Sequence, residues 1–341
     1  MNKQQIAIIG TGPLGLWTAA ALAGDPAAPA LHIRMGNTRG KAPAWVPEAV
    51  RSAQLSGRLT WHALDALNAQ SVHGFAAGST AIVQTAVPQY HEWAAKLPVI
   101  QRNVIEAALA GRARLICADN LYAYAAPASG PLTEQSPEIP PSGKGQVRKD
   151  LLDMMRTMQS ERGLVWATVQ ASQYFGPGAG AQSVFGDWFI DPALQGKPVR
   201  FVGDPSLRHA WAYAPDIGRA MSLLALTQDA RLLDRHWILP HVTQLPANDL
   251  SQLLFRELDR QGVLPGASAR KASAVPGWLL KVLGWFNPVI KARQEMLYQF
   301  QAPFEASGAQ FAQATGFIPA ALDEAVAATV GYWKKTKLGQ A

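Results

Sequence analysis

A glycine-rich corner near the amino end constrains the fold of this chain more than any other feature. The apolar residues 6–9 lead into Gly10, Gly12 and Gly15, and small and apolar residues continue to position 22. This order predicts a strand, a tight turn and a helix. The first glycine allows the turn, the second lets a pyrophosphate approach the backbone, and the third lets the helix pack closely on the strand. The expected dinucleotide site comprises Gly10, Thr11, Gly12, Pro13, Leu14 and Gly15.

The composition is that of an ordinary globular protein. Of the 341 residues, 48% are hydrophobic and 16% are charged, so the chain can bury a sizeable core. No apolar run reaches the roughly 18 residues that an integral membrane segment needs. The single cysteine, Cys117, lies in an apolar run and excludes a disulfide within the chain, and the seven histidines are too dispersed to predict a metal site. We expect a cytoplasmic protein.

The net charge of +7 does not predict a nucleic-acid partner. The basic residues are scattered along the chain, apart from a short lysine-rich stretch near the carboxyl end. An anionic dinucleotide needs only a few of these charges. We therefore expect a small-molecule partner and no nucleic acid.

Strands alternate with helices through the first half of the chain. Apolar runs predict strands at residues 30–35, 58–64, 80–86, 113–118 and 164–171, and helical spacing lies between them at 66–77, 100–110 and 144–162. This alternation predicts an α/β fold with a Rossmann-type doubly wound parallel sheet. The pattern becomes irregular after residue 180. We expect a dinucleotide-binding domain over 1–178 and a mainly substrate-binding domain over 179–341, with 199–230 partly returning to the sheet.

The loop after the second expected strand bears on the choice of coenzyme. An acidic residue there would bind the ribose 2′-hydroxyl of NAD, but the loop carries Asn37, Arg39 and Lys41 and no carboxylate. Two cations suit the additional phosphate of NADP. We expect NADP rather than NAD; the alternative is a merely basic surface loop.

Other strand ends supply further candidate coenzyme contacts. Asp65 could accept a hydrogen bond from the adenine amino group or cap the following helix. Small residues at the end of the fourth strand leave room for the coenzyme. The remaining candidates in this group are Thr85, Ala86, Ser172, Gln173 and Tyr174.

Several motifs together resemble the extended short-chain dehydrogenases/reductases, the superfamily of NAD(P)-dependent epimerases and dehydratases. Besides the glycine corner, they are Asp65, Asn103, Leu132-Thr133-Glu134-x-x-Pro137-x-x-Pro140, Tyr174-Phe175-Gly176-Pro177-Gly178 and the segment 209–217. The resemblance covers most of the chain. It implies a Rossmann fold, a nicotinamide coenzyme, exchange of hydride with a substrate, and a homodimer.

The resemblance fails at both places where the family carries its catalytic residues. Members usually have a serine-rich motif after the fifth strand and a Tyr-x-x-x-Lys motif in the next helix, where the tyrosine exchanges the hydroxyl proton. Here Asn120 occupies the serine position, Lys144 the tyrosine position and Arg148 the lysine position. Tyr122 and Tyr124 follow Asn120 and are further candidates.

These residues could still form a site. Lys144 and Arg148 are four residues apart and so face the same side of a helix. The guanidinium and partial burial would favour the neutral amine of Lys144, which could exchange a proton with a substrate oxygen, while Arg148 keeps the ribose contact. Alternatively, Tyr122 or Tyr124 serves or only shapes the pocket. In a further alternative both cations are solvated charges in a protein that binds NADP without catalysis.

We therefore expect an NADP-dependent oxidoreductase that acts on a carbonyl, alcohol or conjugated alkene of a fairly apolar small molecule. One alternative is a nucleotide-sugar epimerase or dehydratase, for which Arg200, Arg208 and Arg219 are scattered candidate diphosphate ligands. Another is a non-catalytic NADP(H)-binding redox sensor or scaffold. The apolar segment 276–286 is expected to close a hydrophobic substrate pocket or to lie on a membrane surface.

Overall fold

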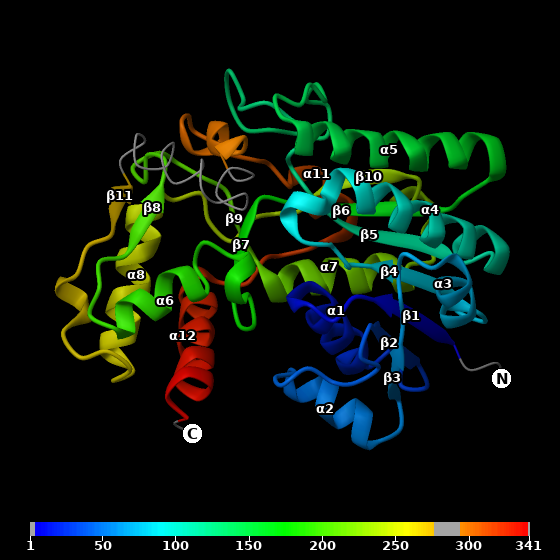
Figure 1. Ribbon diagram of the computed structural model, residues 1–341, viewed down its shortest axis with the longest axis horizontal. Coiled ribbons are helices and arrows are strands. Elements are labelled where there is room, and N and C mark those ends of the chain that lie inside the picture. Colours follow the sequence, from blue (N-terminus) through cyan, green and yellow to red (C-terminus); the bar gives the residue numbers. More distant parts are fainter. Residues whose placement is uncertain (1–3, 276–293, 340–341) are drawn as a thin grey trace. The chain divides into compact units, whose positions relative to one another are not determined.

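The computed structural model describes residues 4–275 and 294–339, which form two compact units (Figure 1). The first unit consists of Met1–Ala123, Gly143–Gln170 and Pro215–Trp237, and the second of Tyr124–Ser142, Ala171–Ala214 and Ile238–Ala341. The sequence predicts domains over 1–178 and 179–341, with 199–230 partly returning to the sheet; in the structure, Pro215–Trp237 belongs to the first unit and Tyr124–Ser142 to the second. The apolar segment 276–286 lies outside the described residues.

A seven-stranded sheet in the order β10-β6-β5-β4-β1-β2-β3 forms the centre of the first unit. Its strands are β1 (Gln5–Ile9), β2 (His32–Asn37), β3 (Leu59–Ala63), β4 (Ala81–Gln84), β5 (Arg114–Asn120), β6 (Trp166–Ala171) and β10 (Arg235–Ile238). The pairs β1–β2, β1–β4, β2–β3 and β4–β5 are parallel, with Ile6 opposite both Ile33 and Ala81. The predicted Rossmann-type α/β fold is confirmed.

Helices cover both faces of this sheet. They are α1 (Pro13–Gly24), α2 (Glu48–Leu55), α3 (Ala69–Ala76), α4 (Trp93–Gly111), α5 (Gly143–Arg162) and α7 (Ala214–Leu226), with short 3-10 turns η1 (Tyr90–Glu92) and η3 (Ala230–Leu232). Figure 1 shows α3, α4 and α5 on one face and α1 and α7 on the other. Helix α7 packs tightly on α1, since a Cβ on Gly218 would lie 2.4 Å from the backbone of Trp17.

Two elements, α4 and β5, extend beyond the bounds that the sequence predicts. Helix α4 begins at Trp93 rather than at residue 100, because Trp93 and Leu97 continue its buried face and Pro98 lies near its amino end. Strand β5 continues to Asn120, two residues beyond the expected end. Trp93 and Asp119 are therefore held by regular structure rather than by loops.

The second unit has little sheet and a largely aromatic core. Its strands pair in parallel, β7 (Gln173–Phe175) with β9 (Trp211–Tyr213) and β8 (Arg200–Val202) with β11 (Ser273–Val275). Its helical elements are η2 (Gly180–Gln182), α6 (Asp187–Leu194), α8 (Ala247–Arg260), η4 (Ala267–Ala269), η5 (Leu297–Phe300), α11 (Ala309–Thr315) and α12 (Leu322–Leu338). Phe189 stacks on Trp333 and Phe185 meets Trp211 edge-on, with ring centroids 5.9 and 4.8 Å apart. Aromatic burial thus stabilises a unit with short strands.

The described helices include none that is both long and apolar enough to cross a membrane. Likewise, within residues 4–275 and 294–339, no group of three or more histidine, cysteine, aspartate or glutamate side chains is placed to hold a metal ion. Cys117 is buried, and burial raises the pKa of its thiol to about 12, so it is a core residue rather than a nucleophile.

Candidate functional site

The three glycines of the corner have three different roles in the structure. Gly10 has a φ of +107°, and a Cβ there would lie 2.7 Å from the Thr85 Oγ1. A Cβ on Gly15 would lie 2.2 Å from the carbonyl oxygen of Gly10. At Gly12, by contrast, no atom lies within 4 Å of the Cβ position. Gly10 and Gly15 therefore allow close packing, and Gly12 leaves the backbone open to a ligand.

The amino end of α1 suits an anion. Gly12 is the N-cap and has no side chain to cap the helix, and Pro13 occupies the first turn. The amides of Leu14 and Gly15 therefore lie in a first turn that no side chain caps. Such amides, together with the helix dipole, bind phosphate groups. The corner fits the pyrophosphate of a dinucleotide.

Neighbouring side chains hold the corner in place. The Thr85 hydroxyl donates to the carbonyl of Ile9 at 3.1 Å, and Ala86 lies against Gly10. The Asn37 amide donates to the Thr11 Oγ1 at 3.0 Å and so joins the loop after β2 to the corner. The structure thus brings together five of the predicted coenzyme residues, Gly10, Thr11, Asn37, Thr85 and Ala86, although Thr85 and Asn37 also support the backbone.

The two cations of the β2 loop are exposed. Arg39 donates its backbone amide to the Asn37 Oδ1 at 3.0 Å, and the carbonyl of Lys41 accepts from the Asn37 Nδ2 at 2.8 Å. These bonds shape the loop and leave both cationic side chains in solvent. Arg34 instead lies near His62 on β3.

Asp65 makes a local turn. Its Oδ1 accepts from the amide of Leu67 at 2.9 Å, whereas the cap of α3 is Asn68, which accepts from the amide of Ser71 at 3.0 Å. Asn103 donates from α4 to the carbonyl of Ala66 at 3.0 Å and holds the same loop. The sequence left open that Asp65 caps α3, but the cap is Asn68. The Asp65 carboxylate is exposed.

A second group of residues, which we call the cation–aromatic cluster, contains the predicted site residues Tyr122, Lys144 and Arg148. It consists of Tyr90, Trp93, Asp119, Tyr122, Lys144 and Arg148, all in the first unit. The Lys144 Nζ lies 4.5 Å from the centroid of the Tyr90 ring, and the Arg148 guanidinium carbon lies 4.4 Å from that of Trp93. Trp93 also contacts the rings of Tyr90 and Tyr122, at centroid distances of 4.8 and 5.9 Å.

Both cations of the cluster are buried. Lys144 is 8% exposed and Arg148 is 7% exposed, so neither is a solvated charge at the helix start. Cations stacked on aromatic faces in this way are stabilised by the ring quadrupole. Neither Tyr90 nor Trp93 is among the residues that the sequence predicted for the site. The aromatic composition of residues 88–93 was the only signal available for them.

Asp119 and Arg148 form a buried ion pair. The Arg148 Nη1 lies 3.3 Å from the Asp119 Oδ1, and Gln170 donates to the other carboxylate oxygen at 3.2 Å. Burial raises the pKa of the Asp119 carboxyl, and the guanidinium opposes that shift. Arg148 is thus held by Asp119 and Trp93.

The remaining catalytic candidates have structural contacts. The Asn120 Oδ1 accepts from the amide of Tyr122 at 3.1 Å and shapes the turn after β5. Tyr124 is fully buried in the second unit, and its carbonyl accepts from the Tyr298 hydroxyl at 3.0 Å. Of the three, only Tyr122 belongs to the cation–aromatic cluster.

Ser172, Gln173 and Tyr174 belong to the second unit. Ser172 donates its amide to the His241 Nε2 at 3.0 Å, and its hydroxyl lies 3.2 Å from the His209 Nε2. Burial lowers the pKa of His209 to about 3 and that of His241 to about 4, so both imidazoles are neutral at ordinary pH. The Tyr174 hydroxyl donates to Gln182 at 3.1 Å.

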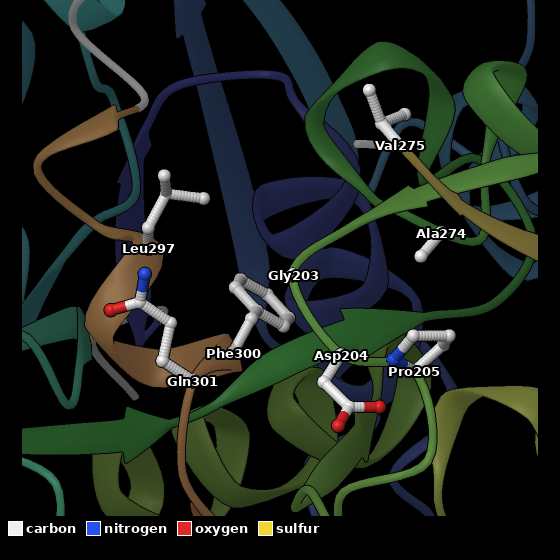
Figure 2. Close-up of a pocket in the computed structure, with 8 residues that line it drawn as sticks. All are labelled: Gly203, Asp204, Pro205, Ala274, Val275, Leu297, Phe300 and Gln301. Atoms are coloured by element: carbon white, nitrogen blue, oxygen red, sulfur yellow. The ribbon is translucent and has the colours of Figure 1, made fainter. Parts of the chain in front are cut away.

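The second unit also contains a pocket of about 410 Å³. Figure 2 shows Leu297, Phe300 and Gln301 facing Ala274 and Val275 across it. Among the described residues the lining is mainly apolar, and its ionisable group is Asp204, which is exposed and whose pKa is lowered by hydrogen bonds from Ser206. A mainly apolar lining suits a fairly apolar small molecule.

Two of the three scattered arginines are already paired. Arg208 contacts Glu305 at 2.6 Å in the second unit, and Arg219 contacts Asp216 at 2.6 Å in the first. Arg200 lies on β8, where it is exposed. Arg200 and Arg208 belong to the second unit and Arg219 to the first.

The chain belongs to the NAD dependent epimerase/dehydratase family, whose model matches residues 10–238. The match begins at the first glycine of the corner, and it confirms the resemblance to extended short-chain dehydrogenases/reductases. A comparison with curated protein sequences finds no match.

Solved structures of nucleotide-sugar enzymes share the fold. A dTDP-glucose 4,6-dehydratase from Streptomyces venezuelae, solved with NAD and TYD bound, is 16% identical with a TM-score of 0.76 over 99% of each chain. A UDP-glucuronic acid 4-epimerase from Bacillus cereus, in complex with NAD, is 15% identical with a TM-score of 0.74 over 99% of each chain. A UDP-N-acetylglucosamine 4-epimerase from Methanobrevibacter ruminantium is 15% identical with a TM-score of 0.75, over 98% of this chain and 99% of that one. At these identities the likeness establishes the fold alone.

Proposed function

We propose that this protein binds a nicotinamide dinucleotide at the glycine corner and acts on a nucleotide sugar by epimerase or dehydratase chemistry. The observation that carries the proposal is the open backbone at Gly12, which is followed by a first turn of α1 that no side chain caps. The amides of Leu14 and Gly15 would hold the pyrophosphate. When bound, the nicotinamide ring supplies hydride exchange with a substrate carbon. The family match and the three enzymes with the same fold support this substrate class.

The coenzyme proposed is NADP, with NAD as the alternative. Arg39 and Lys41 support NADP, because both are exposed at the loop that follows β2 and no carboxylate accompanies them. The dehydratase and the glucuronic acid epimerase named above were solved with NAD, which supports the alternative. Calorimetric titration with both coenzymes in both oxidation states distinguishes the two.

Hydride exchange at an alcohol or carbonyl also requires a proton to move at the oxygen atom. In the first unit, Asp119 is committed to Arg148, and Asn120 cannot titrate. Lys144 and the tyrosines of the cation–aromatic cluster are the groups of this region that can exchange a proton. The proposed reaction therefore depends on this cluster.

A second candidate is an oxidoreductase for a fairly apolar small molecule. The mainly apolar lining of the pocket in the second unit supports it. A homodimer and a cytoplasmic location remain proposals that rest on the resemblance and on the single cysteine.

The deciding experiment begins with calorimetry on the purified protein. Heat on addition of NAD(H) or NADP(H) is expected, and no heat with any of the four would overturn the proposal. The loaded protein is then offered UDP- and dTDP-sugars, followed by apolar ketones, aldehydes and enones. Conversion of a nucleotide sugar supports the first candidate. Coenzyme oxidation by the apolar carbonyls alone supports the second, and coenzyme binding without any turnover supports a sensor or scaffold.

A further inference from the structure

Tyr90 lies at the same edge of the sheet as the glycine corner. It follows β4 by way of Thr85 and Ala86, which lie against Gly10, and the carboxyl ends of parallel strands meet at one edge. The Trp93 indole donates to the carbonyl of Pro88 at 3.2 Å and fixes the loop in between. Tyr90 therefore belongs to a segment at the sheet edge that carries the proposed coenzyme site.

The Tyr90 ring is held by packing on both α4 and α5. It packs with Tyr122 and Val147 against Trp93, Leu97 and Leu151, and its ring meets that of Trp93 at 68°. The ring is partly buried rather than fully enclosed. A side chain fixed in this way can present its hydroxyl in one position, as proton transfer requires.

Lys144 places a positive charge on the face of this ring. Its Nζ lies 4.5 Å from the Tyr90 centroid and is withdrawn from solvent. An opposite charge within this range favours the ionised form of a group. Within residues 4–275 and 294–339, two ion pairs lie nearby: Arg148 with Asp119, and Glu92 with Lys96 on the solvent side. His91 is exposed beside Tyr90 in η1.

We propose that Tyr90 is the catalytic proton carrier of this site and that Lys144 acts through it as a positioning residue, by favouring the phenolate. This inference rests on the proposed function. It assigns to Tyr90 the proton exchange that the tyrosine of the Tyr-x-x-x-Lys motif usually performs in the family. In the oxidative direction the Tyr90 Oη, as a phenolate, would accept the proton of the substrate hydroxyl, and a bound oxidised coenzyme would accept the hydride from the same carbon. The products would be a carbonyl, a phenol and a reduced coenzyme, so that atoms and electrons balance.

The first test needs no substrate. Phenolate formation is followed by ultraviolet absorbance, and the difference between the wild-type protein and Tyr90→Phe isolates the titration of Tyr90. The same difference is measured in a Lys144→Met background. The pH midpoint of Tyr90 ionisation is expected to be at least about 1 unit lower in the protein with Lys144 than in the Lys144→Met background. A shift of this size is the smallest usually produced by a nearby opposite charge. Lys144→Arg, which keeps the cation, should preserve most of this shift.

Lys149 supplies the matched control. It lies on the same helix and pairs with Asp153 at 2.5 Å, so Lys149→Met should leave the Tyr90 midpoint unchanged. An equal midpoint in the presence and absence of Lys144, or an equal change with Lys149→Met, would overturn the proposal.

Turnover and coenzyme binding form the second test. Tyr90→Phe is expected to lower turnover by about 10²-fold or more, the usual contribution of a positioned acid or base, with little change in coenzyme affinity. Full turnover in Tyr90→Phe would overturn the role of Tyr90 while leaving the proposed function intact. A wild-type protein that binds no coenzyme would overturn the proposed function itself, even where the phenolate shift is present.

Discussion

The glycine corner and the cation–aromatic cluster both lie at the sheet of the first unit, but they are built from different parts of the polypeptide. The corner is made by one continuous segment, in which Gly10 and Gly15 exclude side chains and Gly12 leaves the backbone open. The cluster assembles side chains from η1, α4, β5 and α5. The corner has the open backbone expected of a dinucleotide site, whereas the cluster gathers Lys144 and Arg148 onto aromatic side chains. Ligand binding and chemistry can therefore be tested separately.

Lys144→Ala should have the largest effect on turnover among these variants and should separate the two regions most clearly. Loss of this buried cation is expected to lower turnover by about 10²-fold, no more than Tyr90→Phe itself, because the phenolate of Tyr90 loses its counter-charge. Coenzyme affinity, measured by calorimetry, should stay nearly unchanged, since the corner does not involve Lys144. Unchanged turnover would remove the cluster from the reaction.

Arg148→Met is expected to lower the free energy of unfolding by about 3 kcal/mol, because it leaves the Asp119 carboxylate buried without its counter-charge. The measurement is chemical denaturation. Burial raises the pKa of Asp119, so the deficit should shrink as the pH is lowered and the carboxyl takes up a proton. The double variant Asp119→Asn/Arg148→Met should recover most of the loss.

The exposed pair of Arg162 and Glu106 provides the control for this effect. Arg162→Met should change the free energy of unfolding by less than about 1 kcal/mol, as is usual for surface ion pairs. A similar loss in both variants would contradict a special contribution of the buried pair.

Gly12→Val should affect the corner and spare the cluster. A side chain would fit in the free protein, because no atom lies within 4 Å of the Cβ position, yet it would occupy the space proposed for the pyrophosphate. Loss of about two charge-assisted hydrogen bonds weakens the affinity by about 100-fold. Thermal unfolding without coenzyme should be nearly unchanged.

Gly24→Val is the matched control for this variant. Gly24 is the last residue of the same helix and also has no atom within 4 Å of its Cβ position. It should bind coenzyme like the wild-type protein. Equal affinity of the Gly12→Val variant and this control would rule out the corner as the coenzyme site.

Arg39→Ala gives the smallest expected effect and sharpens the choice of coenzyme. If Arg39 binds the 2′-phosphate, the affinity for NADP should fall by about 10-fold, the equivalent of one exposed charged contact, while that for NAD stays the same. Calorimetry with both coenzymes measures the ratio. Equal losses for both would show that Arg39 does not distinguish them.

The fold could be predicted because its signals are local. Residues 6–22 specify a strand, a turn and a helix through apolar content and glycine spacing, and the alternation that follows indicates a doubly wound sheet. The bounds of α4 and β5 were less accessible, since Trp93 and Asp119 join these elements through packing with distant segments. The sequence indicates that a later segment returns to the sheet, but contacts between residues far apart in the chain decide which segments form each compact unit.

For the site, the sequence by itself determined the three glycines, the Asn37 loop and the spacing that places Lys144 and Arg148 on one side of the expected helix. It could not determine what those cations contact. Only the tertiary structure brings Tyr90 and Trp93 onto them and pairs Arg148 with Asp119. The physical reason is the distance along the chain over which each interaction acts. A turn depends on the backbone freedom of adjacent residues. The charge of a buried side chain, by contrast, is stabilised by groups from distant parts of the chain that folding places beside it.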